Sequence, residues 1–230
     1  KVLNYEQEIA NANYPNIRLL QVAKRTSLRP LEQVEVNMNG WQECSPQSVE
    51  NFSALCYFYA LRLWEELKVP VGIIDDDWGG TPAEAWTRAE ALQEVTGFEE
   101  QASKILALQY DEAAVKNYYE SLPQEKRPYI QDFHHSNHAT VLYNAMIHPL
   151  IEFPIRGVIW YQGCNNVGRA AQHQALFQTL ITDWRKCWKN PDMPFYFVQL
   201  ANYLQPSDLQ PESQWALLRE SQADALCLPH

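Results

Sequence analysis

The residues with the clearest capacity for chemistry lie in three short polar segments, each directly after an apolar run. They are 75–81, where three carboxylates precede Trp78, Gly79, Gly80 and Thr81; 162–166, Gln-Gly-Cys-Asn-Asn; and 199–202, Gln-Leu-Ala-Asn. Because glycine lacks a Cβ, Gly79 and Gly80 permit a sharp turn or a close approach of the backbone to a ligand. A strand that ends in a glycine turn predicts a ligand crevice, and an ordinary strand-to-helix connection is an equally open reading.

Two other groups of residues invite a chemical interpretation. His134, His135 and His138 cluster in one loop, but no carboxylate-rich partner set accompanies them, so no metal site is predicted. Cys164 would need a histidine base to act as a thiol nucleophile, and none is near it in the sequence, so an inert or half-buried thiol is expected. The five cysteines are scattered without a Cys-x-x-Cys pair, which argues against a zinc ribbon or a redox pair.

Four apolar runs, at 17–22, 70–75, 155–161 and 194–199, are the predicted β-strands that position the polar segments. Long helical segments separate them, which predicts βαβ units and a parallel sheet with helices on both faces. We therefore expect an α/β fold with three layers, α/β/α, in which the four strands are parallel neighbours in one mostly parallel sheet. Their carboxyl ends then share one edge and bring the three polar segments together.

Two helices carry clear apolar stripes. Ser45-Pro46 predicts a helix start, since serine caps well and proline is tolerated at the first position. The buried face expected for this helix comprises Phe52, Leu55, Tyr59, Leu63 and Leu67. A second helix is expected over 170–188, with Leu176, Leu180, Ile181, Trp184 and Trp188 on one side. Thr87 and Glu90 match a capping box that would open a further helix.

Length and composition narrow the class of protein. The chain has 230 residues, 46% of them hydrophobic, which fits one α/β domain with a substantial core. Its net charge of −10 repels phosphate backbones, so nucleic acid is not an expected partner. No run approaches the roughly 18 apolar residues of a membrane span, and no signal peptide is visible. The 8 Trp and 12 Tyr fit either core packing or a surface on which sugar rings stack.

Two longer motifs resemble a known family. They are Gly72-Ile-Ile-x3-Trp-Gly-Gly-Thr-Pro-x-Glu-Ala-Trp86 and Gly157-Val-Ile-Trp-Tyr-Gln-Gly-x-x-Asn166, and they resemble the bacterial sialate O-acetylesterases of the SGNH-type esterase and lipase superfamily. Further matches are Leu142-Tyr-Asn-Ala-Met146 with His148-Pro149, Asp183-Trp-Arg185, Phe195 to Ala201, and Trp215-Ala-x-Leu-Arg219. The resemblance covers nearly the whole chain in the family's order. It implies an SGNH-hydrolase-like, flavodoxin-like fold, with residues 1–230 as one esterase domain that is incomplete at both ends.

The resemblance also implies an activity. The family removes acetyl groups from sugar hydroxyls, typically on sialic acid, with a serine nucleophile and a histidine base. The oxyanion donors carried over by position are the backbone N–H of Gly79 or Gly80 and the side-chain amides of Gln162 and Asn166. Amides donate without charge, so proton uptake does not compete with this role.

Substrate contacts are expected at three further positions. Glu84 and Trp86 could line a sugar pocket, and a packing role for Trp86 is equally open. Arg219 could clamp the carboxylate of a sialic acid, with a surface ion pair as the plainer alternative. No cofactor is implied, the expected partner is an O-acetylated sugar, and the resemblance implies a periplasmic or secreted protein.

The chain departs from the family in three ways. Cys164 stands where the family commonly has a glutamate, and Asp76 and Asp77 make the rim more acidic. The nucleophile and base motifs are missing: no serine lies within two residues of a glycine, and His148-Pro149 belongs to the Tyr-Asn-Ala-Met segment. We therefore expect the chain to begin after the first catalytic motif, to stop before the last, and to be inactive alone.

Two readings of function follow. The first is an esterase core that acts by serine acyl transfer in the complete protein. The second is a non-catalytic protein of the same fold that binds acetylated glycan or is inactive. An ordered chain would require either other segments of the same protein that complete the sheet or an unusual open edge.

Overall fold

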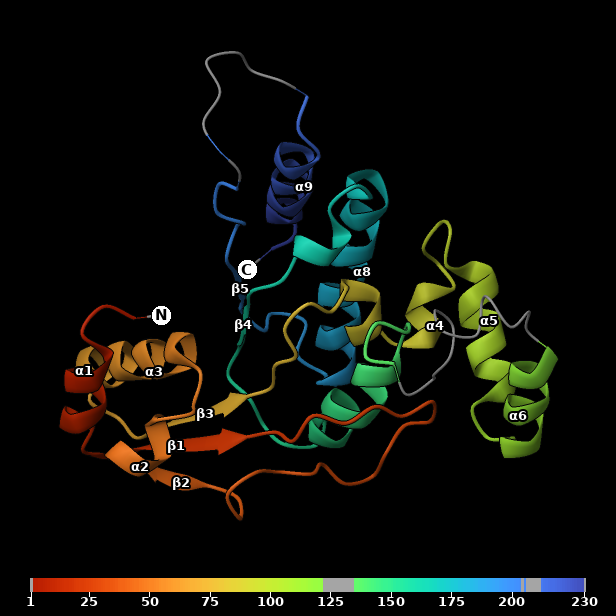
Figure 1. The fold of residues 1–230 in the computed structure, drawn as a ribbon. Coiled ribbons are helices and arrows are strands. Elements are labelled where there is room, and N and C mark those ends of the chain that lie inside the picture. The colour runs from red at the N-terminus through yellow and green to blue at the C-terminus, as the bar shows by residue number, and fades with distance from the viewer. Residues whose placement is uncertain (1, 122–134, 204, 206–211, 230) are drawn as a thin grey trace. The chain divides into compact units, whose positions relative to one another are not determined.

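The computed structural model describes residues 2–121, 135–203, 205 and 212–229. They fall into two compact units (Figure 1). The first unit comprises 1–24 and 34–77, and the second comprises 25–33 and 78–230. No helix in the described ranges is long and apolar enough to cross a bilayer.

The first unit contains a three-stranded sheet with the order β2–β1–β3. Strand β1 (Tyr14–Gln21) pairs in parallel with β3 (Val71–Asp75) and antiparallel with β2 (Gln42–Cys44). Gly72 allows β3 to lie against the ring of Trp41, because a Cβ at this position would come within 3.3 Å of the ring. Strand β2, which follows Trp41, is thus an edge strand of this sheet.

The helix start predicted at Ser45-Pro46 is confirmed, but the helix ends after one turn. Helix α2 spans Pro46–Val49, and the side chain of Ser45 accepts a hydrogen bond from the backbone N–H of Ser48 at 3.3 Å. The next helix, α3 (Ala54–Leu67), begins at a second cap, Ser53. A short helix, α1 (Tyr5–Asn11), precedes β1.

The buried face predicted for the Ser45 helix is wrong. The buried residues of α3 are Cys56, Tyr57 and Ala60, whereas Leu55 and Leu67 are exposed. The real face lies one residue further along the chain, a rotation of about 100° around the helix. Small side chains at Cys56 and Ala60 let the helix approach the sheet closely, and a search for large apolar residues misses them.

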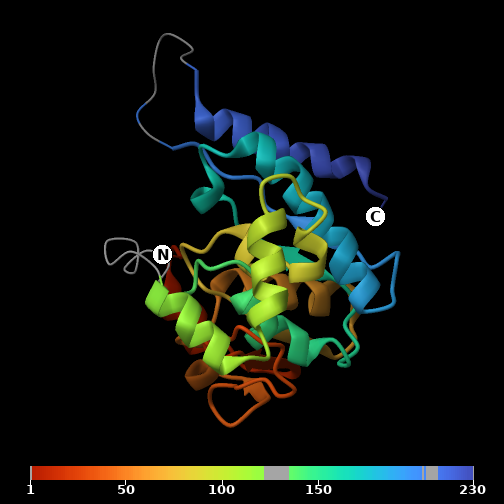
Figure 2. The ribbon, with the colours of Figure 1, turned by 90° about the vertical axis from the view of Figure 1, so that its right-hand side faces the viewer.

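The second unit is built around a parallel pair of strands. Strands β4 (Val158–Trp160) and β5 (Phe195–Phe197) are joined by α8 (Ala170–Cys187). The face predicted for this helix is confirmed for Leu176, Leu180, Ile181 and Trp184, which are buried, whereas Trp188 follows the last residue of the helix and is partly exposed. Further elements are η1 (Ala83–Trp86), α4 (Ala89–Leu92), α5 (Glu99–Leu108), α6 (Glu112–Ser121), the π-helical turn η2 (Tyr143–Ile147), η3 (His148–Leu150), η4 (Cys164–Asn166), α9 (Gln214–Ala223) and η5 (Asp224–Cys227). Figure 2 shows α9, in dark blue, lying along α8.

Trp160 on β4 is the centre of an aromatic cluster. Its ring stacks on Phe177 of α8 with centroids 6.1 Å apart. It meets Trp86 and Trp184 edge-on, at 6.4 and 5.8 Å. Edge-to-face pairs add to the energy of burying the rings. The cluster therefore fixes η1 and α8 on the β4–β5 pair, and with them the segments that follow each strand.

The α/β class with parallel strands joined by helices is confirmed, but the expected single sheet of four strands is not observed. The described strands form one hydrogen-bonded sheet in each unit, β2–β1–β3 and β4–β5. Apolar composition predicts that a segment is a strand, and it does not identify its partner. The capping box at Thr87 is also wrong: α4 begins at Ala89, and the Thr87 hydroxyl instead donates backwards to the carbonyl of Ala83 at 2.9 Å.

Candidate functional site

The glycine turn lies in the second unit, between Trp78 and η1. Gly79 and Gly80 are both exposed, and open space surrounds the position of a Cβ at each. Gly80 has φ +80°, which only glycine adopts without strain. Among the described residues, the structure records no acceptor for the backbone N–H of either glycine. The turn therefore presents two unused donors to solvent.

The loop that follows β4 is hydrogen-bonded onto this turn. The side-chain amide of Gln162 donates to the carbonyl of Thr81 at 3.1 Å, and that of Asn165 donates to the carbonyl of Gly80. The side-chain oxygen of Asn166 accepts from the backbone N–H of Ala83 at 3.0 Å. The structure thus brings together the two segments that carry the four predicted oxyanion donors.

The orientation of the Asn166 amide is fixed by its partners. Its Oδ1 accepts from Ala83 and, at 2.7 Å, from Nε2 of Gln162, while its Nδ2 donates to Oε2 of Glu84 at 2.9 Å. A backbone N–H can only donate and a carboxylate only accepts, so the amide has one orientation that satisfies both. Asn166 is 1% exposed, and one hydrogen of its Nδ2 remains for another acceptor.

Glu84 contacts Asn166, and both of its carboxylate oxygens have a partner. Oε2 accepts from Asn166, and Oε1 lies 2.8 Å from the guanidinium of Arg169. The side chain of Glu84 is 9% exposed, against 39% for Arg169. A buried carboxylate is costly unless it is paired, which explains the arginine. This placement favours a role in holding Asn166 over the sugar contact expected from the sequence.

Gln162 occupies the same cluster as a support. Its Nε2 donates both hydrogens, to Thr81 and to Asn166, so neither is available to an oxyanion in this arrangement. Its Oε1 is buried, and no residue in the described ranges forms a hydrogen bond with it. Gln162 therefore joins the loop to the turn, and its predicted donor role is less well supported than those of the glycines.

The third polar segment is connected through a residue that the sequence did not single out. Gln222 on α9 accepts from the backbone N–H of Leu200 at 3.0 Å and donates to the carbonyl of Gln162 at 2.9 Å. It is 1% exposed. A Cβ on Gly163 would come 3.0 Å from its amide nitrogen, so Gly163 is needed for this close approach. No motif marks Gln222, because its role depends on where α9 packs.

The other two predicted substrate contacts face different environments. Trp86 is 4% exposed, and its indole N–H donates to the hydroxyl of Thr81 at 2.8 Å, which favours the packing interpretation. Arg219 is partly exposed, and its guanidinium donates to Oδ1 of Asn202 at 2.6 Å. An arginine held by a neutral amide, with no carboxylate partner recorded among the described residues, keeps its charge available to an anion.

The carboxylates at the end of β3 and directly after it, Asp75 to Asp77, belong to the first unit. Asp75 accepts from the backbone N–H of Ser53 and from Gln21, both at 3.2 Å, and burial raises its pKa. Burial also raises the pKa of Asp76 well above its ordinary range, and both of its carboxylate oxygens are buried without a hydrogen-bond partner among the described residues. Of the two carboxylates expected to form an acidic rim, Asp76 and Asp77, only Asp77 is therefore exposed.

One contact resembles a catalytic dyad and is not one. Nδ1 of His173, on α8, lies 2.9 Å from the hydroxyl of Ser221. That hydroxyl donates its single hydrogen to the carbonyl of Leu218 at 2.8 Å, so the histidine must be the donor, the reverse of a general base. Both side chains are buried, and burial lowers the pKa of His173 to about 4. The pair is structural.

The other candidates from the sequence are the Cys164 thiol and the histidine cluster. Cys164 is exposed and unbridged, so the alternative of a half-buried thiol is wrong and the inert thiol stays a prediction. His134 lies outside the described residues. Within the ranges that are described, no group of three His, Cys, Asp or Glu side chains could hold a metal ion.

Comparison with known proteins finds several that are similar to this chain. Residues 128–229 match the family model described as carbohydrate esterase, sialic acid-specific acetylesterase. The chain is 28% identical over 232 residues to the sialate O-acetylesterases of Homo sapiens and Pongo abelii, an alignment that covers 94% of the chain and 40% of each relative. The chain therefore spans about two fifths of the length of these relatives.

A solved structure extends the likeness. The crystal structure of a carbohydrate acetylesterase from Xanthomonas citri matches with a TM-score of 0.73 and 33% identity, covering 97% of this chain and 43% of that protein. Because the relatives are both mammalian and bacterial, a specifically bacterial origin stays a prediction. The resemblance inferred from the motifs is confirmed: the chain is similar to sialate O-acetylesterases and to a carbohydrate acetylesterase, and its residues 128–229 match the model of the sialic acid-specific acetylesterases.

Proposed function

We propose that this chain supplies the oxyanion-binding part of an esterase that removes O-acetyl groups from sialic acid or related acetylated sugars. The observation that carries the proposal is the exposed turn at Gly79 and Gly80, whose N–H groups have no recorded acceptor among the described residues, beside the loop that holds Asn166. Acyl transfer needs fixed donors where the carbonyl oxygen becomes negative. A left-handed glycine turn and an immobilised amide provide such donors without bearing a charge.

The residues of the proposed site have different roles. The N–H of Gly79 or Gly80 and the free hydrogen of the Asn166 amide donate to the oxyanion. Gln162 and Glu84 hold the Asn166 amide in one orientation, and Arg169 neutralises Glu84. Donors that are already oriented need no rearrangement as the charge develops, which is the source of their catalytic value.

The nucleophile and its base are the groups this site does not contain. Acyl transfer in the family's manner requires an activated serine with a histidine base, and no described serine–histidine contact is suited to that role. In the proposed enzyme, the part of the protein outside these 230 residues provides them and adjoins the turn at 79–81. Other segments of the same protein would then complete the sheet.

The substrate assignment rests on the family and on one side chain. The relatives' names specify acetyl esters of sialic acid or carbohydrate, and Arg219 offers a charge for a sialic acid carboxylate. Trp86 and Glu84 contribute to the proposed site through packing and support. We extend the proposal to a periplasmic or secreted location, with no nucleic acid or membrane as a partner and no cofactor.

The alternative is a protein of the same fold that binds acetylated glycan without cleaving it. The observation that favours it is Cys164, which replaces the glutamate common in the family and leaves the loop without that carboxylate. Hydrolysis separates the two: only an esterase releases acetate from the bound sugar.

The test compares two proteins in a hydrolysis assay with a generic acetyl ester. We expect no efficient turnover by the purified 230-residue chain, because an oxyanion hole without a nucleophile retains at most about 10³–10⁴-fold acceleration over water. The full product of the gene should turn over, and Asn166→Ala in it should lower kcat by about 10²–10³. An unchanged rate removes Asn166 from this role. Turnover near 10 s⁻¹ by the short chain would identify a nucleophile within it, with Cys164 the first residue to replace.

A further inference from the structure

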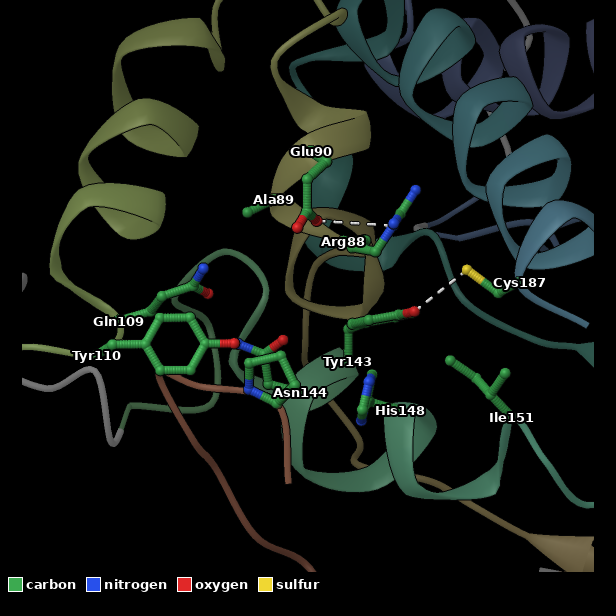
Figure 3. Close-up of a pocket in the computed structure, with 11 residues that line it drawn as sticks. Arg88, Ala89, Glu90, Gln109, Tyr110, Tyr143, Asn144, His148, Ile151 and Cys187 are labelled. Carbon is green, nitrogen blue, oxygen red and sulfur yellow. Dashed lines mark hydrogen bonds and ion pairs between the residues drawn. The ribbon is translucent and has the colours of Figure 1, made fainter. Parts of the chain in front are cut away.

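A second concavity, of about 290 Å³, lies in the second unit, and none of its lining residues belongs to the site described above. The side chains that face it come from α4, from the connection between α5 and α6, and from η2 and η3. Figure 3 shows Glu90, Tyr110 and His148 extending from three of these elements toward the same space. Ligand pockets typically measure about 300–1,000 Å³, so this one has room for a single small ring.

The polar groups around the pocket offer both donors and acceptors. Nδ1 of His148 lies 3.0 Å from the carbonyl of Leu31 and must donate to it, which leaves Nε2 as an acceptor. The Glu90 carboxylate is a second acceptor, and the carboxamide of Gln109 offers both functions. Such a mixture matches a ligand whose groups each donate and accept, which is the property of a hydroxyl.

The charges around the pocket exclude an anionic ligand. The guanidinium of Arg88 is held by two hydrogen bonds to the buried carboxylate of Asp183, at 2.7 and 3.2 Å, and lies 3.6 Å from Glu90. One cation therefore faces two carboxylates, and the local sum is −1. A ligand with its own carboxylate would be repelled, whereas a neutral ligand would meet no net penalty.

An aromatic side chain that is not packed in the protein core lies at the rim of the pocket. Tyr110 is 73% exposed, and its ring borders the pocket beside Gln109 (Figure 3). An exposed aromatic ring at the edge of a polar pocket offers a flat apolar face against which a ligand ring can pack. The pyranose or furanose ring of a sugar has such a face, edged by hydroxyl groups.

We infer that this pocket is a second carbohydrate site, which takes one neutral sugar ring. Tyr110 stacks on the face of the ring, Glu90 and Nε2 of His148 accept from its hydroxyls, and Gln109 completes the set. The inference goes beyond the proposed function and rests on it only for the expectation that sugars are the protein's ligands. In the intact protein, such a site would hold a neighbouring residue of a glycan while acetyl removal occurs elsewhere.

The test is ligand binding, measured by saturation-transfer NMR on the full product of the gene. The probes are a panel of neutral methyl hexosides and methyl pentosides, with N-acetylneuraminic acid as the anionic comparator. We expect at least one neutral glycoside to bind saturably. Tyr110→Ala should weaken its binding about tenfold, the upper range for a single aromatic contact, and Glu90→Ala should weaken it as well. Tyr196→Ala, which removes a tyrosine that is 60% exposed on β5, is the matched control and should bind as the unchanged protein does.

Three results would overturn the inference: no saturable binding of any neutral glycoside, equal binding by Tyr110→Ala and Tyr196→Ala, or loss of the binding when Asn166→Ala is introduced. The last outcome would assign the sugar to the oxyanion site instead. Because binding is measured without hydrolysis, a protein that binds the glycoside and releases no acetate would contradict the proposed function and leave this inference standing.

Discussion

Replacement of Asn166 by aspartate tests the central feature of the site, the fixed direction of one amide. The variant keeps the shape of the side chain and its oxygen, which still accepts from Ala83 and Gln162. It places a carboxylate oxygen where Nδ2 stands, 2.9 Å from Oε2 of Glu84. A buried donor–acceptor pair thus becomes a buried pair of acceptors that carry like charges.

The cost can be worked from this geometry. Two unit charges 4 Å apart repel by about 4 kcal/mol at an effective dielectric constant near 20, and the lost hydrogen bond to a charged group is worth about 1.5–3 kcal/mol. Arg169 offsets part of the repulsion. We therefore expect Asn166→Asp to lose about 3–5 kcal/mol of unfolding free energy near pH 7, a large share of the roughly 5–15 kcal/mol typical of a domain.

The loss should depend on pH with a definite sign. The two carboxylates relieve their repulsion by binding a proton, which raises the folded-state pKa of the pair above the ordinary value near 4. The folded variant then holds a proton that the unfolded chain releases. Its stability is therefore greatest below about pH 4 and falls as the pH rises, by up to about 1.4 kcal/mol per unit relative to the unchanged protein.

The assay is urea unfolding followed by tryptophan fluorescence, between about pH 4 and pH 8. Asn165→Asp is the control, because it makes the same chemical change at the exposed neighbour. Asn166→Ala provides a second comparison: it removes the same hydrogen bonds without adding charge, so its loss should not grow with pH. If Asn166→Asp follows Asn165→Asp at every pH, then Glu84 and Asn166 do not form the contact on which the site is built.

Three further predictions concern single residues. Gly80→Ala should lose about 1–2 kcal/mol of unfolding free energy, the cost of a left-handed backbone with a Cβ, while Gly79→Ala, whose φ lies outside that region, stays near the unchanged value in the same urea titration. Trp86→Phe should cost about 1–2 kcal/mol through the lost bond to Thr81, and thermal unfolding would expose an error if its midpoint did not fall. His173 has its pKa lowered to about 4 by burial, against about 6.5 unfolded, so its contribution is complete above pH 6.5 and is lost as the pH falls toward 4, by up to about 3 kcal/mol. Stability measured against pH should be flatter in His173→Gln, and identical profiles would show that this histidine does not remain neutral in the fold.

The sequence predicts the strands and the position of the polar segments well, for a physical reason. Apolar runs bounded by glycine and proline are local features, and all four predicted runs contain strands. The rule that ligand sites follow the carboxyl ends of parallel strands also needs only local information. It locates the Gly79–Gly80 turn and the loop at 162–166, which the structure joins through hydrogen bonds.

Local sequence features do not predict which strands pair or in which direction a side chain points. Asn166 reaches Glu84 across 82 positions of the chain, and Gln222 reaches Gln162 across 60. The packing of α8 and α9 brings these residues together in space. No periodicity or motif in the sequence indicates that packing. The error in the buried face of α3 has a similar origin, since the close approach of Cys56 and Ala60 to a sheet is a property of the pair of elements.

The burial of Glu84 is the strongest argument that the cluster around Asn166 is more than packing. A protein that needed only to join a loop to a turn could do so with neutral groups, at no cost in charge desolvation. Here a carboxylate is buried, an arginine is recruited to neutralise it, and the result is an amide whose donor end points in one direction. Pairs of this kind are often no more stable than apolar replacements, so stability alone gives no reason to keep one. Orientation of a donor toward a reacting oxygen does give a reason, because a donor that is misdirected loses its effect on the transition state while the fold stays intact.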